Sequence, residues 1–357
     1  MKIAIIEEFS RVGGGQKFAL MLSDMLSEEG FDISFITDSE HRFLQDRTEK
    51  IQEMKFKYID GKNIISMLLE AIKLKGELKL LTGFDFVINN HPNMFLFNGG
   101  INSLHSISIV EQLLSENGDI QNDFLFNILK YSRFYKIYEN GKFWVPTKFN
   151  RDISFKVFEQ LGIKQTKFLV LPIPFTNIPD VNLNEKRDQI LIFGRISKDK
   201  GTDLVVELAK QIDKKFIIAG AVNPGNERYY RNLQESAPDN VTIIPNPTEE
   251  IKGTLFRESK MYLHLRKREN FPISVLEAIS YGCVPIVPKN GGMWTDIIQK
   301  GKYGLGYDSL SEVSQSVNKA EAMSENDLKT ILNSRERFSY KDFKSQYLKM
   351  VTESINQ

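Results

Sequence analysis

The hydrophobic positions near the amino terminus change their spacing twice. Residues 3–6 form a short continuous apolar run, which is typical of a strand buried on both faces of a parallel sheet. After the glycines at 13–15, apolar residues recur every three or four positions, which predicts an amphipathic helix that ends near Gly30. These positions are Phe18, Met21, Leu22, Met25 and Leu26. A second apolar run at 33–37 completes a strand–helix–strand unit, the start of an α/β architecture.

The same alternation restarts near residue 190. A strand, a helix and another strand are predicted at 190–193, 203–212 and 216–219. Later strands are predicted at 241–244, 261–265 and 284–287. Two such series predict two Rossmann-like domains. Because ligands bind at the carboxyl ends of the strands in sheets of this kind, we expect the site in a cleft between two domains that face each other.

A proline-rich stretch separates the two series. Residues 171–180 hold three of the chain's 12 prolines, which suits a stiff connection better than the interior of a helix or strand. We therefore predict an amino-terminal domain at 1–172, a carboxyl-terminal domain at 173–337 and a final helix at 338–357. The apolar positions of that helix are Phe338, Tyr340, Phe343, Tyr347 and Leu348.

The composition fits a globular protein and narrows its partners. A length of 357 residues favours two domains, and 41% hydrophobic with 26% charged residues excludes wholesale disorder. A formal charge of +1 argues against a general nucleic-acid binder. Cys283 is the only cysteine, which excludes an internal disulfide and favours a reducing compartment. A cytoplasmic location is expected, because no apolar run is long enough to span a bilayer and the apolar start is too short for a signal peptide.

The loop after the predicted strand at 190–193 carries the first candidate chemistry. It reads Gly-Arg-Ile-Ser-Lys-Asp-Lys-Gly at 194–201, and a loop before a helix presents backbone N–H groups and a favourable helix dipole to an anion. Arg195 and Lys200 would add two positive charges there. The alternative is a surface turn whose charges are solvated. The loop is not a Walker A motif, because Asp199 occupies the sixth position, where that motif requires glycine.

A second candidate lies at 266–277, where Glu269 and Glu277 stand eight positions apart. Ser274 and Glu277 have the spacing of a capping box, which predicts a helix from about Val275. Glu277 therefore has two interpretations: a helix cap, or an acceptor of hydrogen bonds from the hydroxyls of a ligand. Glu269 is either a loop carboxylate paired with the neighbouring basic residues or a side chain in the cleft.

The stretch 124–151 interleaves aromatic and basic residues. It contains six basic residues and one acid, Glu139. Such a stretch suits either contact with an anionic membrane surface or a domain helix whose aromatic residues belong to the core. Its interleaved aromatic residues include Phe124, Phe126, Tyr131, Phe134, Tyr135, Tyr138, Phe143 and Trp144.

These motifs resemble those of a known family. The pattern Glu269-x7-Glu277, followed by Ala278 and by Gly-Cys-Val-Pro-Ile-Val at 282–287, resembles the signature of the retaining glycosyltransferases of family 4, which have the GT-B fold. The loop at 194–201 is similar to that family's diphosphate clamp, and the glycines at 13–15 are similar to its amino-terminal glycine loop. The resemblance implies an α/β protein with two Rossmann-like domains facing across a cleft. It also implies that the final helix crosses back onto the first domain.

The resemblance implies roles for individual residues. Arg195 and Lys200 would hold the diphosphate of a nucleotide sugar and stabilise the leaving group. Glu269 would lie near the donor sugar, and Glu277 would bind the ribose hydroxyls. The other donor-binding positions would be Gly14, Gly15, Asn270, Phe271, Ile273 and Ser274.

Several positions differ from the family pattern or indicate a particular group within the family. The family's active-site histidine maps to His105, with His91 as the alternative. Gln16 stands where many members have an acidic residue, and a different handling of the acceptor is therefore expected. Pro272 has no N–H to offer a phosphate. Residues 291–298 are similar to members that elongate lipid-linked oligosaccharides, which suggests a lipid-borne acceptor.

We therefore predict a retaining glycosyltransferase that moves a sugar from a nucleoside-diphosphate sugar to a glycan or lipid-linked acceptor. No metal or other cofactor is expected, because the chain lacks the D-x-D motif of GT-A enzymes. One alternative is a non-catalytic partner subunit that binds a nucleotide sugar. The other is a nicotinamide-dependent oxidoreductase, whose fingerprint fails at Phe18, where glycine or alanine is needed. A cytoplasmic location with peripheral membrane contact through 124–151 is expected, with no nucleic-acid partner.

Overall fold

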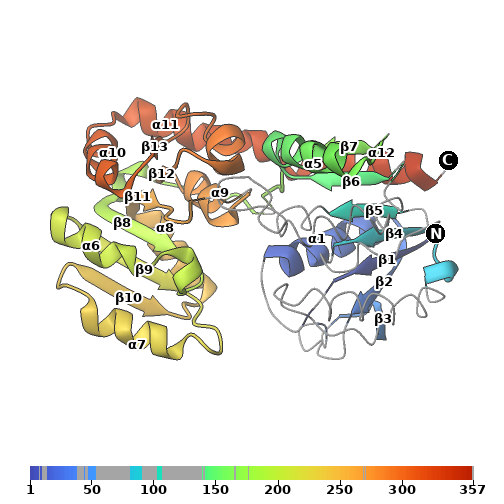
Figure 1. The fold of residues 1–357 in the computed structure, drawn as a ribbon, viewed down its shortest axis with the longest axis horizontal. Helices are drawn as coiled ribbons and strands as arrows, with labels where there is room; N and C mark the ends of the chain where they lie inside the picture. Colours follow the sequence, from blue (N-terminus) through green and yellow to red (C-terminus); the bar gives the residue numbers. More distant parts are fainter. Residues whose placement is uncertain are drawn as a thin grey trace. The chain divides into compact units, whose positions relative to one another are not determined.

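The structure is a computed structural model, and it describes residues 1–7, 9, 14–37, 44, 47–53, 81–90, 103–106, 139, 141–164, 166–175, 177–267, 269 and 271–355. The chain divides into two compact units (Figure 1). Unit 1 comprises Met1–Ile173 and Tyr340–Gln357, and unit 2 comprises Pro174–Ser339. The chain therefore passes from unit 1 to unit 2 within the proline-rich stretch at 171–180.

Unit 1 is built on a seven-stranded sheet with the order β3-β2-β1-β4-β5-β6-β7. The paired strands run parallel. The strands are β1 (Lys2–Ile6), β2 (Asp32–Thr37), β3 (Lys50–Glu53), β4 (Phe86–Asn89), β5 (Ser103–Ser106), β6 (Lys142–Val145) and β7 (Lys167–Val170). In β1, Ile3 pairs with Ile33 of β2 and with Phe86 of β4. The predicted strands at 3–6 and 33–37 are confirmed.

The described helices of unit 1 pack onto this sheet. They are α1 (Gly14–Glu28), α5 (Lys148–Leu161) and α12 (Tyr340–Ile355). Helix α1 ends two residues before Gly30 and buries all five predicted apolar positions. Helix α12 adds Phe343, Tyr347 and Val351 to the same core, and the Phe343 ring lies 5.9 Å from the ring of Phe18 in α1. The predicted return of the final helix to the first domain is confirmed, but the helix begins at Tyr340, and Phe338 belongs to the core of unit 2.

Unit 2 is built on a six-stranded sheet with the order β10-β9-β8-β11-β12-β13. Its paired strands also run parallel. The strands are β8 (Arg187–Phe193), β9 (Lys215–Gly220), β10 (Val241–Pro245), β11 (Ser259–Leu263), β12 (Val284–Pro288) and β13 (Leu305–Tyr307). All the strands predicted in this half of the chain are present. The fold class is therefore the predicted one, with two parallel-sheet α/β units.

The helices of unit 2 enclose the sheet and its core. They are α6 (Leu204–Gln211), α7 (Glu227–Ser236), α8 (Glu249–Glu258), α9 (Ile273–Ser280), α10 (Val313–Glu321) and α11 (Glu325–Asn333). Shorter turns are η5 (Leu183–Glu185), η6 (Lys198–Lys200), the π-helical η7 (Met293–Ile297), η8 (Leu310–Glu312) and η9 (Ser334–Phe338). Neighbouring strands contribute Ile190, Phe216, Met261 and Val284 to the core, each 0% exposed. Burial of such a side chain stabilises the fold by about 1.5–3 kcal/mol.

The start of α9 differs from the sequence prediction. The helix begins at Ile273 with Pro272 as its cap, and Ser274 lies inside the first turn without capping it. Ser274 Oγ accepts a hydrogen bond from the Tyr262 hydroxyl at 2.7 Å, and Glu277 forms an ion pair with Lys252. The predicted capping box is therefore wrong, because both of its side chains have partners on neighbouring elements.

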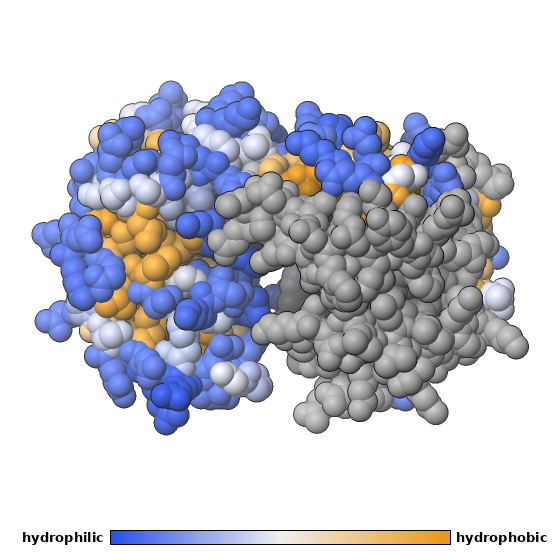
Figure 2. Space-filling model, in the orientation of Figure 1, coloured by the Kyte–Doolittle hydropathy of each residue, from blue (hydrophilic) through white to orange (hydrophobic). Residues whose placement is uncertain are grey.

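The surface and the helices give two further observations. Among the described residues, none of the helices combines the length and the hydropathy that are needed to cross a lipid bilayer. Figure 2 shows a largely hydrophilic surface on unit 2, with an apolar area within it.

Candidate active site

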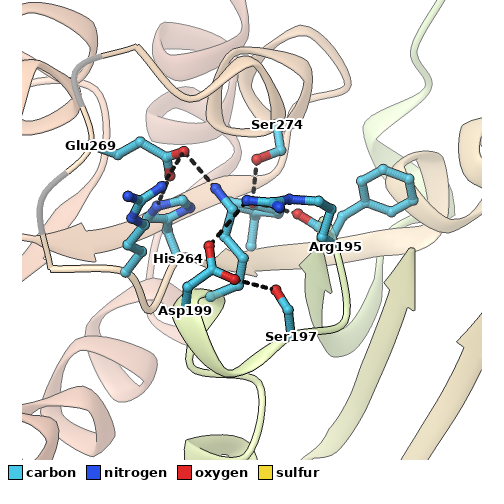
Figure 3. A network of polar contacts seen from close by, with 10 residues as sticks. Arg195, Ser197, Asp199, His264, Glu269 and Ser274 are labelled. Atoms are coloured by element: carbon cyan, nitrogen blue, oxygen red, sulfur yellow. Dashed lines mark hydrogen bonds and ion pairs between the residues drawn. The ribbon is translucent and has the colours of Figure 1, made fainter. Parts of the chain in front are cut away.

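The two candidate motifs of the sequence meet at one edge of the unit 2 sheet. Strands β8 and β11 are neighbours, and they end at Phe193 and Leu263. Because the strands are parallel, the loops that follow them lie at the same carboxyl-terminal edge, where sheets of this kind bind ligands. The two loops bring together Arg195, Ser197, Asp199, Lys200, His264 and Glu269 (Figure 3).

A close backbone approach shapes the loop after β8. The N–H of Gly194 donates a hydrogen bond to the carbonyl of Ala219 at 3.0 Å. Gly220, the last residue of β9, has φ of +150°, and a Cβ atom there would lie 1.6 Å from the carbonyl oxygen of Gly194. A side chain at this position is therefore excluded, and the glycine allows the loop to turn directly at the end of the sheet.

Arg195 lies on this loop beside an acidic partner. Its Nη2 is 3.0 Å from Asp199 Oδ2, and Ser197 Oγ donates a hydrogen bond to Asp199 Oδ1 at 2.6 Å. Burial raises the pKa of Asp199, but the Ser197 hydrogen bond and then the charge of Arg195 bring that pKa below its usual value. The Arg195 side chain is 47% exposed, which leaves the guanidinium accessible to an anion.

Glu269 joins the two loops. Its Oε1 is 2.5 Å from Lys200 Nζ, and its Oε2 is 2.7 Å from His264 Nε2. Arg266 is more distant, with Nη1 3.7 Å from Oε1. The Lys200 and Glu269 side chains are only 19% and 20% exposed. Two residues that the sequence singled out in separate motifs are therefore in direct contact.

The carboxyl of Glu269 is ionised in this setting. Burial raises its pKa, but His264 and then Lys200 lower that pKa more, and the balance lies well below the usual value. A carboxyl that stays ionised near neutral pH is not suited to donate a proton. It is suited to accept hydrogen bonds from hydroxyl groups and to stabilise a developing positive charge.

His264 is a residue of the site for which the sequence reasoning gave no role. It directly follows β11 and is 6% exposed. Its N–H donates to the carbonyl of Ile286 at 2.9 Å, and its carbonyl accepts from the Tyr307 hydroxyl at 2.7 Å. Its Nε2 lies 2.7 Å from Oε2 of Glu269, which places the imidazole directly beside the carboxylate. A polar residue at the end of an apolar strand was the signal that the sequence offered.

A second backbone approach holds the Glu269 loop. Gly291 has φ of +78°, and a Cβ atom there would lie 2.4 Å from the carbonyl oxygen of Glu269. The left-handed conformation and the lack of space both require glycine at this position. Gly291 is the first residue of the 291–298 segment, whose sequence suggested a lipid-borne acceptor. In the structure, its backbone lies against the backbone of Glu269.

The second predicted carboxylate, Glu277, lies on α9 and contacts a different lysine. Lys252 of α8 contacts its Oε1 through Nζ, and Glu249 is 3.3 Å from the same ammonium. Burial lowers the pKa of Lys252, but the charge of Glu277 and then that of Glu249 raise it above its usual value. Glu277 is thus held by an ion pair and does not cap its own helix.

The other predicted donor-binding positions lie around the start of α9. Phe271 packs against the core of unit 2, with its ring centroid 6.2 Å from that of Phe338. Ile273 is the first residue of α9, and Ser274 is held by Tyr262. Asn270 lies outside the described residues.

Unit 1 contains a buried carboxylate that the sequence did not predict. Gly14 and Gly15 open α1 and are exposed. Glu7 follows β1, is 3% exposed, and accepts a hydrogen bond from Gln16 Nε2 at 3.0 Å. Asn90 Nδ2 donates to the other oxygen of Glu7 and to the carbonyl of Gly15. The side chain of Glu7 therefore lies against the backbone of Gly15, and an added Cβ atom at Gly15 would lie 3.3 Å from its Oε2.

The predicted active-site histidine lies on a strand inside the unit 1 sheet. His105 belongs to β5 and pairs in register with Asn89 of β4 and Phe143 of β6. The strand places this residue near the carboxyl-terminal edge of the sheet. The alternative, His91, lies outside the described residues, as does Gly13.

Two aromatic residues in the described part of the stretch at 124–151 are buried. Phe143 and Trp144 are 2% and 5% exposed. The Trp144 ring stacks on Phe18 with centroids 4.4 Å apart, and its Nε1 donates to the carbonyl of Leu171 at 2.9 Å. Residues 124–138 and 140 lie outside the described residues, and membrane contact through this stretch stays a prediction.

Within the described part of the chain, no three His, Cys, Asp or Glu side chains gather as a metal site would require. The prediction of a reaction without a metal ion stays a prediction.

The chain passes from the first parallel-sheet α/β unit to the second after Ile173 and returns after Ser339, so that the final helix joins the first unit. This arrangement defines the GT-B class of fold. Comparison with solved structures confirms this class. Sucrose-phosphate synthase from Thermosynechococcus elongatus matches with a TM-score of 0.71 at 16% identity, over 99% of this chain and 98% of that chain. Anabaena HepE in complex with UDP-glucose matches with a TM-score of 0.70 at 13% identity, over 99% of this chain and 100% of that chain.

The family model described as Glycosyl transferases group 1 matches residues 175–344. This match spans the segment that carries Arg195, Lys200, Glu269 and Glu277, and the predicted resemblance to that family is confirmed. A glycogen synthase from Clostridium perfringens (strain 13 / Type A) is 28% identical over 160 residues, which are 44% of this chain and 31% of that protein. The chain thus spans about a third of that relative's length.

Proposed function

We propose that the protein is a glycosyltransferase that moves a sugar from a nucleoside-diphosphate sugar to a hydroxyl group of a glycan or lipid-linked acceptor. The contact between Lys200 and Glu269 carries this proposal. It brings a cation and an ionised carboxylate together at the ligand-binding edge of the unit that matches the glycosyltransferase family. A donor with an anionic diphosphate and a hydroxyl-rich sugar needs both kinds of group.

The two cations serve the leaving group. When the bond to the sugar breaks, negative charge grows on the departing nucleoside diphosphate. Arg195 and Lys200 lie on one short loop and would stabilise that charge. Preorganised charge at the atoms where charge develops is the largest single contribution that a protein makes to such a reaction. This stabilisation requires no metal ion, and we propose that the reaction proceeds without one.

Glu269 serves the sugar. As an anion it would accept hydrogen bonds from sugar hydroxyls and stabilise the positive charge that develops on the sugar ring as the diphosphate leaves. His264 and the backbone of Gly291 hold this carboxylate in place. We propose that the anomeric configuration is retained, as the family resemblance implies. Glu277 would bind the ribose hydroxyls of the donor.

The acceptor is assigned to unit 1. His105 lies on β5 of that sheet and is the proposed active-site histidine. Gln16 donates a hydrogen bond to Glu7 at 3.0 Å, and we propose that polar side chains of this kind in unit 1 bind a hydroxyl-bearing acceptor. Anabaena HepE has been solved with UDP-glucose, which makes uridine donors the first to try.

The test is turnover of defined donors. UDP-glucose, GDP-mannose and ADP-glucose are each incubated with soluble glycans and with lipid-linked oligosaccharides, and release of the nucleoside diphosphate is followed with and without EDTA. One donor should be consumed in both conditions, and NMR of the product should show the anomeric configuration of the donor.

Glu269→Ala should abolish this turnover, because the anion at the donor sugar is lost. Glu235→Ala removes an exposed carboxylate on α7 and should leave the rate unchanged. An unchanged rate in the Glu269 variant would remove this residue from the mechanism. Binding of a nucleotide sugar without transfer to any acceptor or to water would instead identify a non-catalytic protein.

A further inference from the structure

Lys252 contacts a residue of the proposed donor site but has no role in the reaction proposed above. It lies on α8, and its ammonium contacts the carboxylate of Glu277 on α9. The ring centroid of Phe193, the last residue of β8, is 5.6 Å from the same ammonium, within the range of a cation–π contact. Three elements of unit 2 therefore converge on one lysine.

The ion pair is shielded from solvent. The side chains of Lys252 and Glu277 are 15% and 23% exposed, whereas the side chain of Glu249, the outer partner, is 77% exposed. An exposed Lys–Glu pair contributes little to stability and changes its geometry easily. A covered pair holds its geometry, because separating it would leave an uncompensated charge in a poorly solvated place. Lys252 therefore fixes the position of the Glu277 carboxylate.

Lys252 and Glu277 have more hydrogen-bonding positions than the contact between them uses. A carboxylate offers about four lone-pair positions on two oxygens, and an ammonium has three N–H donors. Lys252 contacts Oε1 of Glu277, which leaves Oε2 for a ligand. A fixed carboxylate oxygen that is oriented by an ammonium suits a neighbouring pair of hydroxyls, since each hydroxyl both donates and accepts hydrogen bonds.

We propose that Lys252 is a positioning residue for recognition of the donor's ribose: it holds Glu277 so that the free carboxylate oxygen meets the ribose hydroxyls. This inference rests on the proposed function, in which Glu277 binds the ribose. It adds a residue on α8 to the binding site and makes ribose recognition depend on an ion pair between two helices.

The test compares nucleotides that differ only in their ribose hydroxyls. UDP, 2′-deoxy-UDP and 3′-deoxy-UDP are titrated calorimetrically into the wild-type protein, Lys252→Met, Lys252→Arg and Glu277→Gln. If the wild-type protein binds GDP or ADP instead of UDP, that nucleotide and its deoxy analogues replace the uridine set. Lys210→Met is the matched control, because Lys210 forms an exposed i,i+3 pair with Glu207 on α6.

The wild-type protein should bind UDP about tenfold more tightly than at least one deoxy analogue, since a hydrogen bond to a charged group is worth about that factor or more. Lys252→Met should lose this preference and bind all three nucleotides with similar affinity. Lys252→Arg should recover most of it, and Lys210→Met should match the wild-type protein. Thermal unfolding of each variant checks that the nucleotide-binding unit is folded.

The outcomes distinguish a failure of the proposed role of Lys252 from a failure of the proposed role of Glu277. If Glu277→Gln loses the ribose preference and Lys252→Met keeps it, the role of Lys252 is wrong and the proposed function stands. If Glu277→Gln also keeps the preference, or if no nucleoside diphosphate binds the wild-type protein, the ribose role of Glu277 fails, and the role of Lys252 fails with it. Tighter binding of UDP to Lys252→Met would also overturn the proposal, because Lys252 would then obstruct the ribose.

Discussion

The loops after β1 and β8 occupy the same place in two similar sheets, but their described residues carry different polar side chains. In unit 1, β1 lies between β2 and β4, and in unit 2, β8 lies between β9 and β11. Arg195 and Lys200 follow β8. Glu7 follows β1, and its buried carboxylate contacts Gln16 and Asn90. The shared topology therefore presents different polar side chains at the same edge of the two sheets.

The difference shows which unit is suited to a diphosphate. A helix that begins after a strand attracts an anion through its dipole and its free N–H groups. In unit 1, the carboxylate of Glu7 already lies near the start of α1. In unit 2, two side-chain cations lie on the corresponding loop. Fold alone does not settle function, and we propose that the two loops serve different ligands.

Among the residues of the two compared loops, the largest effect is expected from removal of Lys200 after β8. Lys200→Ala should lower kcat for sugar transfer by about 100-fold to 1000-fold, because one preorganised charge at the leaving group is lost. Steady-state kinetics with the donor that the protein turns over measure this effect. Lys198→Ala removes an exposed lysine from the same turn and should change kcat less than about threefold. Equal losses in both variants would show that only the net charge of the loop matters.

A smaller loss is expected when the backbone of the Glu269 loop is displaced. Gly291→Ala forces a Cβ atom against the carbonyl of Glu269, and kcat should fall by about tenfold to 100-fold, because small misplacements of reacting groups are costly. Gly225→Ala is the control, since Gly225 also has a left-handed φ, of +91°, but has open space around it. Both variants should lose about 1–3 kcal/mol of stability from backbone strain. Similar activities in the two variants would contradict the role of Gly291.

Loss of the histidine beside Glu269 should have a moderate effect on the chemical step. His264→Leu should lower kcat about tenfold, since one oxygen of a largely buried carboxylate loses its neighbour. His264→Gln, which keeps a polar group, should retain most of the rate. The KM for the donor should change less than about twofold in both variants, because His264 is expected to act through Glu269. A change confined to KM would instead place His264 in substrate binding.

The smallest of these effects concerns stability in acid. The pKa of Glu269 is lower in the folded protein than its ordinary value of about 4.3 in an unfolded chain. Its stabilising contribution is therefore present above that pH and is lost as the pH falls towards the folded pKa. The difference in unfolding free energy between the wild-type protein and Glu269→Gln should shrink as the pH falls from about 5 to about 3. Urea unfolding measures it, and a difference that does not change with pH would contradict the shift.

Much of the fold was predictable because the patterns that indicate its strands and helices lie within short segments of the sequence. The apolar runs of β1, β8 and β9 and the helical spacing in α1 each follow from neighbouring residues in the sequence. The meeting of Lys200 with Glu269 was also predictable in outline, since both follow strands that end at the same edge of a parallel sheet.

The remaining features of the site depend on contacts between distant parts of the chain. The carboxylate of Glu277 looked like a helix cap, but Lys252 on α8 binds it. His264 and Glu7 each follow a buried strand, and their sequence neighbours do not reveal their partners. The need for glycine at 291 arises from the approach of the Glu269 loop, which a single sequence does not encode in any local pattern.

The measurement that tests the central claim most directly is the affinity for UDP of three proteins: wild type, Lys200→Ala and Glu7→Gln. If the loop after β8 binds the diphosphate, Lys200→Ala should bind UDP at least about tenfold more weakly than the wild-type protein, since each lost charge-assisted contact is worth about that factor. Glu7→Gln should bind UDP within about twofold of the wild-type protein. If Lys200→Ala binds UDP as the wild-type protein does, the diphosphate does not lie on the loop after β8, and the assignment of the two units is wrong.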